Sequence, residues 1–279
     1  MNSYAYYNGK FGKRNEISIP LSDRSIFFGD AIYDAAIGSY DRILWEDDHL
    51  ERFLANARAM GINHEFSKKQ IKDLLHEVAI KSMIDCYFIY FQMSRSSPVR
   101  NHSANGCNSS ILITVDPISI NETPKPLKLI TAEDLRYGYC NIKTINLLPA
   151  VIAMTEAEKA ECDEAVFINN NIVTECSKSN ISIIKQGRLI THPINNKILP
   201  GIARKRLLEI CNEISIICEE REFTRDELFS ADEVIVSSTT KLCNAVSHIN
   251  GVRVGSQNSS ITKKIHEIMY KEFTDFCIL

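Results

Sequence analysis

The sequence predicts an α+β fold in two domains, and three observations indicate it. The chain has 279 residues, enough for one large core or two modest ones. Apolar strands and amphipathic helices are mixed along it, without the regular strand–helix–strand alternation of a parallel α/β protein. The polar hexapeptide NETPKP contains two prolines and is the best linker candidate. We therefore predict an N-terminal domain over residues 1–120, a linker over 121–126 and a second domain over residues 127–279.

In the N-terminal part, short apolar runs predict strands, and apolar residues three and four apart predict helices. Asn8-Gly9 is a hairpin turn signal. An amphipathic helix should start near Asp47, and Ser67 with Gln70 forms a capping box that opens a second helix. The expected strands are a short pair within residues 4–21, a pair within 27–45, and single strands over 86–95 and 109–120.

In the C-terminal part, the expected strands are shorter and more numerous. A helix should begin near Pro149, since proline is favoured in a first turn, and Thr224 with Glu227 should cap a short helix. Asn250-Gly251 is a second hairpin signal. The remaining expected helices are 199–213 and 261–273, and the expected strands lie within 127–137, 165–169, 172–175, 180–185, 188–192, 214–220, 231–241 and 244–254.

Composition narrows the class of protein. Hydrophobic residues make up 44% of the chain and charged residues 24%, as in an ordinary soluble globular protein. A net charge of -3 argues against a nucleic-acid-binding surface, which normally shows a basic excess. No apolar run is long enough to span a bilayer, and the first residues lack the apolar core of a signal peptide. We expect a cytoplasmic protein with no nucleic-acid or membrane partner.

The nine cysteines indicate neither disulfides nor a metal site. They are odd in number, and no C-x-x-C pair occurs, which disfavours a zinc knuckle or a redox motif. We expect reduced, mostly buried thiols and no bound metal.

Lys143 is the only charged residue between Gly138 and Thr155, and Ile142, Ile145, Leu147 and Leu148 surround it. An amine among apolar neighbours is disfavoured in its charged form, so it becomes a nucleophile and base, as Schiff-base chemistry requires. The ordinary alternative is a lysine that extends its amine to water, and this segment alone favours that alternative.

Two further segments could bind an anion. The turn before residue 202 leads from glycine into a helix, where backbone N–H groups stay free at a positive dipole end. Residues 237–240 are four consecutive hydroxyl residues after an apolar strand. Each has an ordinary alternative, a plain turn and a helix cap or solvated loop.

Other polar residues could bind a charged ligand. Glu175 ends an apolar strand, where a carboxylate can orient a cationic partner such as a protonated heterocycle. Arg100 and His102 lie two apart in an extended segment, so both can face one carboxylate. Exposed polar residues at turns and loops are the ordinary alternative for all three. Tyr33 and Arg52 have equally ordinary readings, a strand aromatic and a helix-surface arginine.

Taken together, these motifs resemble the fold-type IV pyridoxal-phosphate enzymes, which include D-amino-acid and branched-chain aminotransferases and aminodeoxychorismate lyase. The resemblance covers essentially the whole chain. It implies a small N-terminal α/β domain and a larger C-terminal domain with a barrel-like mixed sheet. The motifs that carry it are FFGDAIYD, HLERF, YFQMSRSSPVRNH, CNIKTINLLPAVIA, NNNIVTECSKSN, THPINNKILPGIAR and VSSTTK.

The resemblance implies a role for each matched residue. Lys143 would bind pyridoxal 5'-phosphate covalently and act as the catalytic base, and Glu175 would pair with the protonated pyridine nitrogen. Leu199 would pack against the pyridine ring. The phosphate would be held by Arg52, the backbone of Ile202 and Ala203, and the hydroxyls of Ser238 and Thr239. The substrate carboxylate would be bound by Tyr33, Arg100 and His102, partly from the second subunit of a homodimer.

The implied activity is transamination between amino acids and 2-oxo acids. The Arg-x-His pair at 100 and 102 and the IK-x-x-NLL arrangement at 142–148 are most similar to D-amino-acid (D-alanine) aminotransferases. These act on D-amino acids with 2-oxoglutarate by a ping-pong mechanism that gives a 2-oxo acid and D-glutamate. The alternatives are aminodeoxychorismate lyase, a branched-chain L-amino-acid aminotransferase, or a catalytically impaired homologue that binds the cofactor.

Some positions depart from the pattern of these relatives. Ala203 stands where a threonine hydroxyl would help to hold phosphate, which leaves that contact to the backbone. Cys176 and Lys178 replace small residues after Glu175, and we expect them close to the cofactor ring. Gly138 and Tyr139 replace bulkier or cationic residues near the substrate. These departures bear on substrate range and turnover rather than on the cofactor.

Overall fold

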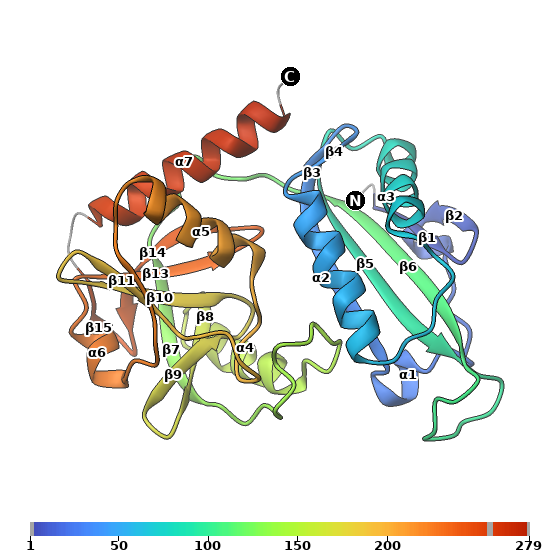
Figure 1. Ribbon diagram of the computed structural model, residues 1–279, viewed down its shortest axis with the longest axis horizontal. Helices are drawn as coiled ribbons and strands as arrows, with labels where there is room; N and C mark the ends of the chain where they lie inside the picture. The colour runs from blue at the N-terminus through green and yellow to red at the C-terminus, as the bar shows by residue number, and fades with distance from the viewer. Residues whose placement is uncertain (1–2, 256–258, 278–279) are drawn as a thin grey trace. The chain divides into compact units, whose positions relative to one another are not determined.

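The computed structural model describes residues 3–255 and 259–277, which form two compact units (Figure 1). The first unit contains the chain through Ser119, the segment Ile142–Asn146 and the chain from Thr274 on. The second unit contains Ile120–Asn141 and Leu147–Phe273. The predicted linker lies just after the Ser119 boundary, and the Lys143 segment packs with the first unit although it follows that linker. Each unit combines helices with its own sheet, which confirms the predicted α+β class.

The first unit is built on an antiparallel sheet with the strand order β2-β1-β6-β5-β3-β4. Helices α2 and α3 pack against this sheet through apolar faces that include Phe53 and Leu75, and their core partners include Phe91 of β5. The elements are β1 (Tyr4–Tyr7), β2 (Lys10–Lys13), η1 (Arg14–Glu16), α1 (Ser25–Phe28), β3 (Ala31–Ser39), β4 (Arg42–Ile43), α2 (Glu46–Ala59), α3 (Lys68–Ser82), β5 (Cys86–Ser96) and β6 (Asn108–Pro117).

The local signals of this unit act largely as predicted. Asn8 and Gly9 both have positive φ angles between β1 and β2, and Ser67 accepts the N–H of Gln70 in a reciprocal capping box. The expected strand within 16–21 is wrong. Those residues form the end of η1 and an irregular segment, because β2 already occupies the edge of β1 and Pro20 has no N–H to donate.

The second unit is built on a mixed sheet with the strand order β12-β11-β10-β13-β14-β7-β8-β9. The pairs β11/β12, β14/β7 and β7/β8 are parallel. Strand β9, at one end of this order, runs through residues 177–179 directly into β10 in its middle, so the sheet curls into the barrel-like form that was expected. The strands are β7 (Leu127–Glu133), β8 (Glu164–Asn169), β9 (Ile172–Cys176), β10 (Asn180–Lys185), β11 (Arg188–Thr191), β12 (Cys218–Glu220), β13 (Glu233–Ser238), β14 (Leu242–Ile249) and β15 (Val252–Arg253).

The helices of the second unit follow their sequence signals. Pro149 lies in the first turn of α4, and Thr224 caps α6 through the N–H of Glu227. The helices are α4 (Leu148–Lys159), α5 (Ile202–Glu213), α6 (Arg225–Phe229) and α7 (Ser260–Cys277), of which the last ends in the first unit. Over the described residues, no helix combines the length and apolarity that crossing a bilayer requires.

Candidate active site

The segment that carries Lys143 covers an open edge of β3. Strand β4 pairs with β3 only at Gly38 and Ser39, which leaves the first half of β3 without a neighbour on that side. The N–H of Tyr33 donates to the Lys143 carbonyl at 2.8 Å, and the N–H of Ile145 donates to the Ala31 carbonyl at 3.3 Å. Backbone pairing of this kind fixes the position of a short irregular segment. Lys143 therefore has a defined place beside β3.

The amine of Lys143 lies over an aromatic ring. Its Nζ is 4.3 Å from the centroid of the Tyr33 ring, a cation–π distance. Tyr33 in turn stacks on Tyr90 of β5, with ring centroids 5.2 Å apart. Lys143 is partly buried. Two residues that the sequence predicted for one site, the catalytic lysine and one of the substrate-binding side chains, are thus in direct contact.

Arg52, predicted to bind phosphate, is held by a buried carboxylate. Asp34 on β3 accepts two hydrogen bonds from Arg52 on α2, from Nε at 2.8 Å and from Nη2 at 2.7 Å. Asp34 also lies 2.8 Å from Nδ1 of His49, one turn before Arg52 on the same helix. The Asp34 side chain is fully buried, and 9% of the Arg52 side chain is exposed. This bidentate pair fixes the direction of the guanidinium.

Charge and burial set the ionisation of this cluster. Burial by itself raises the pKa of Asp34, but the charges of Arg52 and His49 lower it further, so the net shift is well below the usual range. Burial lowers the pKa of His49, and the charges of Arg52 and Lys143 add to that effect against the pull of Asp34. The cluster therefore holds an ionised Asp34 and favours a neutral His49 at neutral pH.

Arg100 and His102 lie in the exposed loop between β5 and β6. The Arg100 guanidinium lies 4.9 Å from the centroid of the Phe28 ring in α1, and the His102 ring lies 5.2 Å from the same ring. Phe28 therefore brings the two predicted clamp residues to one side of the loop. Tyr33, the third predicted member, instead contacts Lys143 and Tyr90.

In the second unit, Glu175 on β9 is buried and ion-paired. Its Oε1 accepts a hydrogen bond from Nη1 of Arg136, and Arg136 also pairs with Asp134 at 2.7 Å. The Arg136 guanidinium lies 4.5 Å from the Phe167 ring centroid. Although burial opposes it, hydrogen bonding and charge from Arg136 lower the pKa of Asp134. A guanidinium beside Glu175 favours the charged carboxylate.

Asn180 links Glu175 to the start of α5. Its Nδ2 donates to Oε2 of Glu175 at 3.0 Å and to the Leu199 carbonyl at 2.9 Å, and the Leu199 N–H donates to the same Glu175 oxygen at 3.0 Å. A Cβ on Gly201, the residue that caps α5, would lie 2.0 Å from Oδ1 of Asn180. Glycine is thus required for the close approach of these two segments.

The first turn of α5 and the end of β13 carry the predicted phosphate ligands of this unit. Ile202 and Ala203 follow the side-chain-free cap Gly201, so their N–H groups lack intrahelical partners. Ser238 ends β13 and Thr239 begins the following turn. Residue Ser237 of β13 pairs with Asn180 across the sheet, which brings β13 to the segment that holds Leu199. Among the described residues, no partner lies within hydrogen-bond distance of the buried Oγ of Ser237.

The departures noted in the sequence have different outcomes. Cys176 does not lie on the face of β9 that carries Glu175, because its side chain is part of the apolar core of the unit and burial raises its pKa. Lys178 is exposed on the turn between β9 and β10. Gly138 is also exposed, and Ala203 is buried. The expectation that Cys176 lies close to the ring that Glu175 would bind is therefore wrong.

The family model for amino-transferase class IV matches residues 32–249 of this chain. The chain belongs to the class IV aminotransferase family. It is therefore an aminotransferase, as the resemblance implied. The matched residues contain Tyr33, Arg52, Lys143, Glu175 and the start of α5.

Individual relatives agree with this membership. The chain is 34% identical over 254 residues to the D-alanine aminotransferase of Bacillus licheniformis, which covers 90% of this chain and 89% of that protein. It is 31% identical over 279 residues to the D-alanine aminotransferase of Listeria monocytogenes, covering 97% of this chain and 96% of the relative. The crystal structure of a branched-chain aminotransferase from Thermoproteus uzoniensis with norvaline superposes with a TM-score of 0.89 at 22% identity. That match covers 98% of this chain and 97% of the other, and it establishes the shared fold.

A further solved structure, that of a branched-chain amino acid aminotransferase with pyridoxamine 5'-phosphate, has a TM-score of 0.89 at 18% identity and covers 98% of this chain and 97% of that one. The residues of the present chain suit a cofactor of this type. Glu175 offers a carboxylate to a pyridinium, and the N–H groups at the start of α5 offer donors to a phosphate a short distance along the same hydrogen-bonded segment. The buried Ser237 hydroxyl adds a donor that the chain itself does not use among its described residues.

Three residues that hold the predicted ones in place carry no motif that marks them in the sequence. Asp34 fixes Arg52, Arg136 pairs with Glu175, and Asn180 joins Glu175 to Leu199. A weak signal exists for Asp34, a charged residue in the apolar run AIYDAAIG. Its partner is 18 positions away on a helix, and only the packing of α2 on β3 brings the two together.

Proposed function

We propose that this aminotransferase uses pyridoxal 5'-phosphate to transfer the amino group of D-amino acids, D-alanine among them, to 2-oxoglutarate. The products would be a 2-oxo acid and D-glutamate. The observation that carries the proposal is the 34% identity to a D-alanine aminotransferase over 90% of the chain. The branched-chain aminotransferases that share the fold are only 17–22% identical.

The proposed cofactor ligands come from both ends of the chain. Lys143 would hold the cofactor covalently, Glu175 would bind its pyridine nitrogen, and Leu199 would pack on its ring. The phosphate would be held by Arg52, the N–H groups of Ile202 and Ala203, and the hydroxyls of Ser238 and Thr239. When bound, pyridoxal phosphate supplies a carbonyl carbon for the amino group and a ring that takes up electrons from the substrate Cα.

Lys143 is the proposed proton carrier. Once the substrate amine has displaced its own, the Lys143 amine is free to remove the proton from the substrate Cα and later to return it. The amine must be neutral when it accepts that proton and mobile enough to reach it. Its contacts suit this role, because the backbone of the segment is tied to β3 while the amine rests only on the Tyr33 ring among the contacts described.

Glu175 would hold a proton on the pyridine nitrogen. A carboxylate does this only if it stays ionised and keeps its direction. Arg136 favours the ionised form, and the N–H of Leu199 and the amide of Asn180 fix the second oxygen. Asp134 orients Arg136 through a paired contact, so the carboxylate is supported by a chain of buried charges.

Arg100, His102 and Tyr33 are the proposed ligands of the substrate carboxylate. Their position would decide which face of the substrate presents its Cα hydrogen to Lys143, and therefore whether D- or L-amino acids react. We further propose that the protein is a homodimer in which part of this clamp comes from the second subunit. Sedimentation equilibrium of the purified protein would test the dimer.

The test of the activity is a screen of paired D- and L-amino acids with 2-oxoglutarate. We expect pyruvate from D-alanine, detected with lactate dehydrogenase, and parallel lines when initial rates are plotted reciprocally at several 2-oxoglutarate concentrations. The parallel lines would reflect two half-reactions that share no ternary complex. The Arg100→Ala/His102→Ala double variant should show a strongly raised KM for D-alanine while the cofactor stays bound.

Other outcomes identify the alternatives. Preference for L-valine or L-leucine would show a branched-chain aminotransferase, and release of pyruvate from aminodeoxychorismate would show a lyase. A yellow protein with neither activity would be an impaired homologue that retains the cofactor. A colourless protein that pyridoxal phosphate cannot reconstitute would refute the proposal as a whole.

A further inference from the structure

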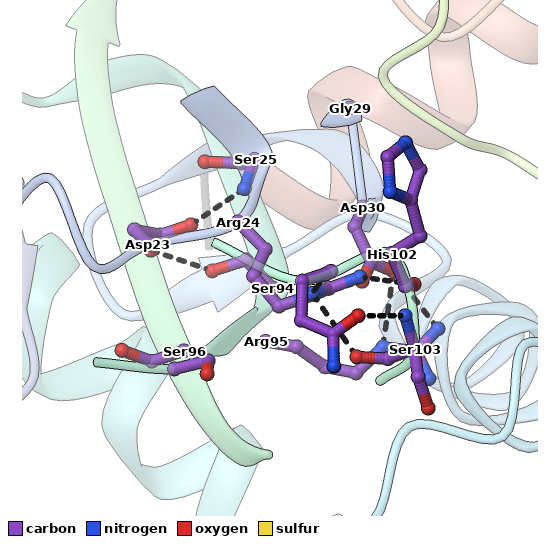
Figure 2. Close-up of polar contacts among 12 residues, drawn as sticks. Asp23, Arg24, Ser25, Gly29, Asp30, Ser94, Arg95, Ser96, His102 and Ser103 are labelled. Carbon is purple, nitrogen blue, oxygen red and sulfur yellow. Dashed lines mark hydrogen bonds and ion pairs between the residues drawn. The ribbon is translucent and has the colours of Figure 1, made fainter. Parts of the chain in front are cut away.

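Arg24 is a buried arginine that lies outside all the residues assigned above. It is 5% exposed, and its guanidinium is directed at the loop that carries Arg100 and His102 (Figure 2). Nη1 donates to the carbonyls of Asn101 and Ser103, the latter at 3.4 Å, and Nη2 donates to the His102 carbonyl at 3.0 Å. Three consecutive carbonyls of the loop therefore converge on one cation.

The position of Arg24 is fixed independently of the loop. Its Nε donates to Oδ2 of Asp30 at 2.7 Å, and its backbone N–H donates to the carbonyl of Arg95 at 2.8 Å. The preceding residue, Asp23, accepts hydrogen bonds from Ser94 at 2.7 Å and from the N–H of Ser25 at 2.9 Å, as Figure 2 shows. The guanidinium is thus a rigid fork anchored on β5.

The same residue also supports the side chains of the loop. The Arg24 guanidinium lies 4.6 Å from the centroid of the Phe28 ring. Arg100 and His102 lie against that ring at 4.9 and 5.2 Å. Arg24 therefore contacts both the backbone of the loop and the aromatic ring on which its two cationic-capable side chains rest.

We propose that Arg24 is a positioning residue for the substrate carboxylate, one that sets the loop conformation in which Arg100 and His102 bind it. This inference rests on the proposed function. A long polar loop is costly to order, and an exposed one loses its shape unless buried groups hold its backbone. Arg24 supplies that hold without being a substrate ligand itself, so its removal should affect substrate binding more than turnover.

The chain contains a matched control for this role. Arg95 pairs with the same carboxylate, Asp30, with Nε at 3.0 Å from Oδ1. Its other donors go to the carbonyls of Met60 at 2.9 Å and Gly61 at 3.4 Å, just after α2, and not to the clamp loop. Arg24→Gln and Arg95→Gln therefore remove the same ion-pair chemistry from Asp30 but differ in whether the loop loses its anchor.

The experiment compares these two variants in the intact holoenzyme. In Arg24→Gln we expect the KM for D-alanine to rise on the order of tenfold or more, with kcat changed by less than about threefold, because only the positioning of binding groups is lost. In Arg95→Gln the KM should stay within about twofold of the wild type. Arg24→Lys retains the charge beside Asp30 but cannot span three carbonyls, so it should give an intermediate KM and serves if Arg24→Gln does not fold.

A second measurement needs no substrate. Trypsin cleaves after Arg100, and amide hydrogen exchange reports on residues 100–103. Both should be faster in the Arg24 variants than in Arg95→Gln, since the loop opens more often. Equal KM values in the two glutamine variants, or a loop equally protected in both, would overturn the inference. A wild type that does not use D-alanine would refute the proposed function instead, and the KM comparison would then be made with the amino acid that the screen identifies.

Discussion

Replacing Asp34 with Asn should strongly destabilise the first unit. The Asp34 side chain is fully buried, and its two oxygens accept two hydrogen bonds from Arg52 and face Nδ1 of His49. Asn has nearly the same shape but places an amide N–H against these donors and leaves the Arg52 charge unpaired. Removing one partner of a buried ion pair costs about 3–5 kcal/mol.

The chain contains a convenient probe for this change. Its single tryptophan, Trp45, immediately precedes α2, the helix that carries Arg52, so its fluorescence reports on the first unit. With a urea m-value of about 2 kcal/mol per molar, the midpoint of the Trp45 transition should fall by about 2 M. The control is Asp73→Asn, which removes an exposed i,i+4 pair with Lys69 and should cost less than about 0.5 kcal/mol.

The pH dependence provides a further test of the same reasoning. The folded-state pKa of Asp34 is depressed, so its contribution is present above the unfolded pKa of about 3.9 and is lost as the pH falls toward the folded value. The difference in unfolding free energy between wild type and Asp34→Asn should therefore shrink below about pH 4. A midpoint shift as small as that of the Asp73 control, or a difference that grows on acidification, would refute the assignment of a stabilising buried ion pair.

Three other changes have defined outcomes. Lys143→Ala should lower the transamination rate by at least about a hundredfold and abolish fixation of the cofactor by borohydride; a variant that keeps the borohydride-fixed cofactor would exclude Lys143 as its attachment site. Gly201→Ala should weaken cofactor binding in an equilibrium titration, because the added Cβ would collide with Asn180, whereas unchanged affinity would mean that Asn180 can move at no cost. Hydrogen bonding to Glu46 raises the pKa of His76, so this pair stabilises the fold fully below about pH 6.5 and less as the pH rises through the folded value. In His76→Gln that loss should disappear from thermal melts recorded across this range, and an unaltered pH profile would contradict the pairing.

Much of the fold could be predicted because its signals are local. The capping boxes at Ser67 and Thr224 depend on residues three positions apart, and both form in the structure. The Asn8-Gly9 turn needs positive φ angles, which these residue types adopt readily. The strand expected within 16–21 failed because pairing is not local. β2 was the competitor for the edge of β1, and nothing in residues 16–21 themselves reveals it.

The candidate site divides in the same way. The sequence by itself determined which chemistry is available: a lysine in an apolar segment, a carboxylate at a strand end, and a glycine turn into a helix, in the order that marks the family. Only the tertiary structure decided what supports them, namely Asp34 under Arg52, Arg136 beside Glu175 and Arg24 beneath the clamp loop. Cys176 shows the limit of reading neighbours from the chain, since it adjoins Glu175 in sequence but its side chain enters the core. The physical reason is that residue type fixes what a side chain can donate, accept or carry as charge, whereas burial and pairing depend on segments brought together from distant parts of the chain.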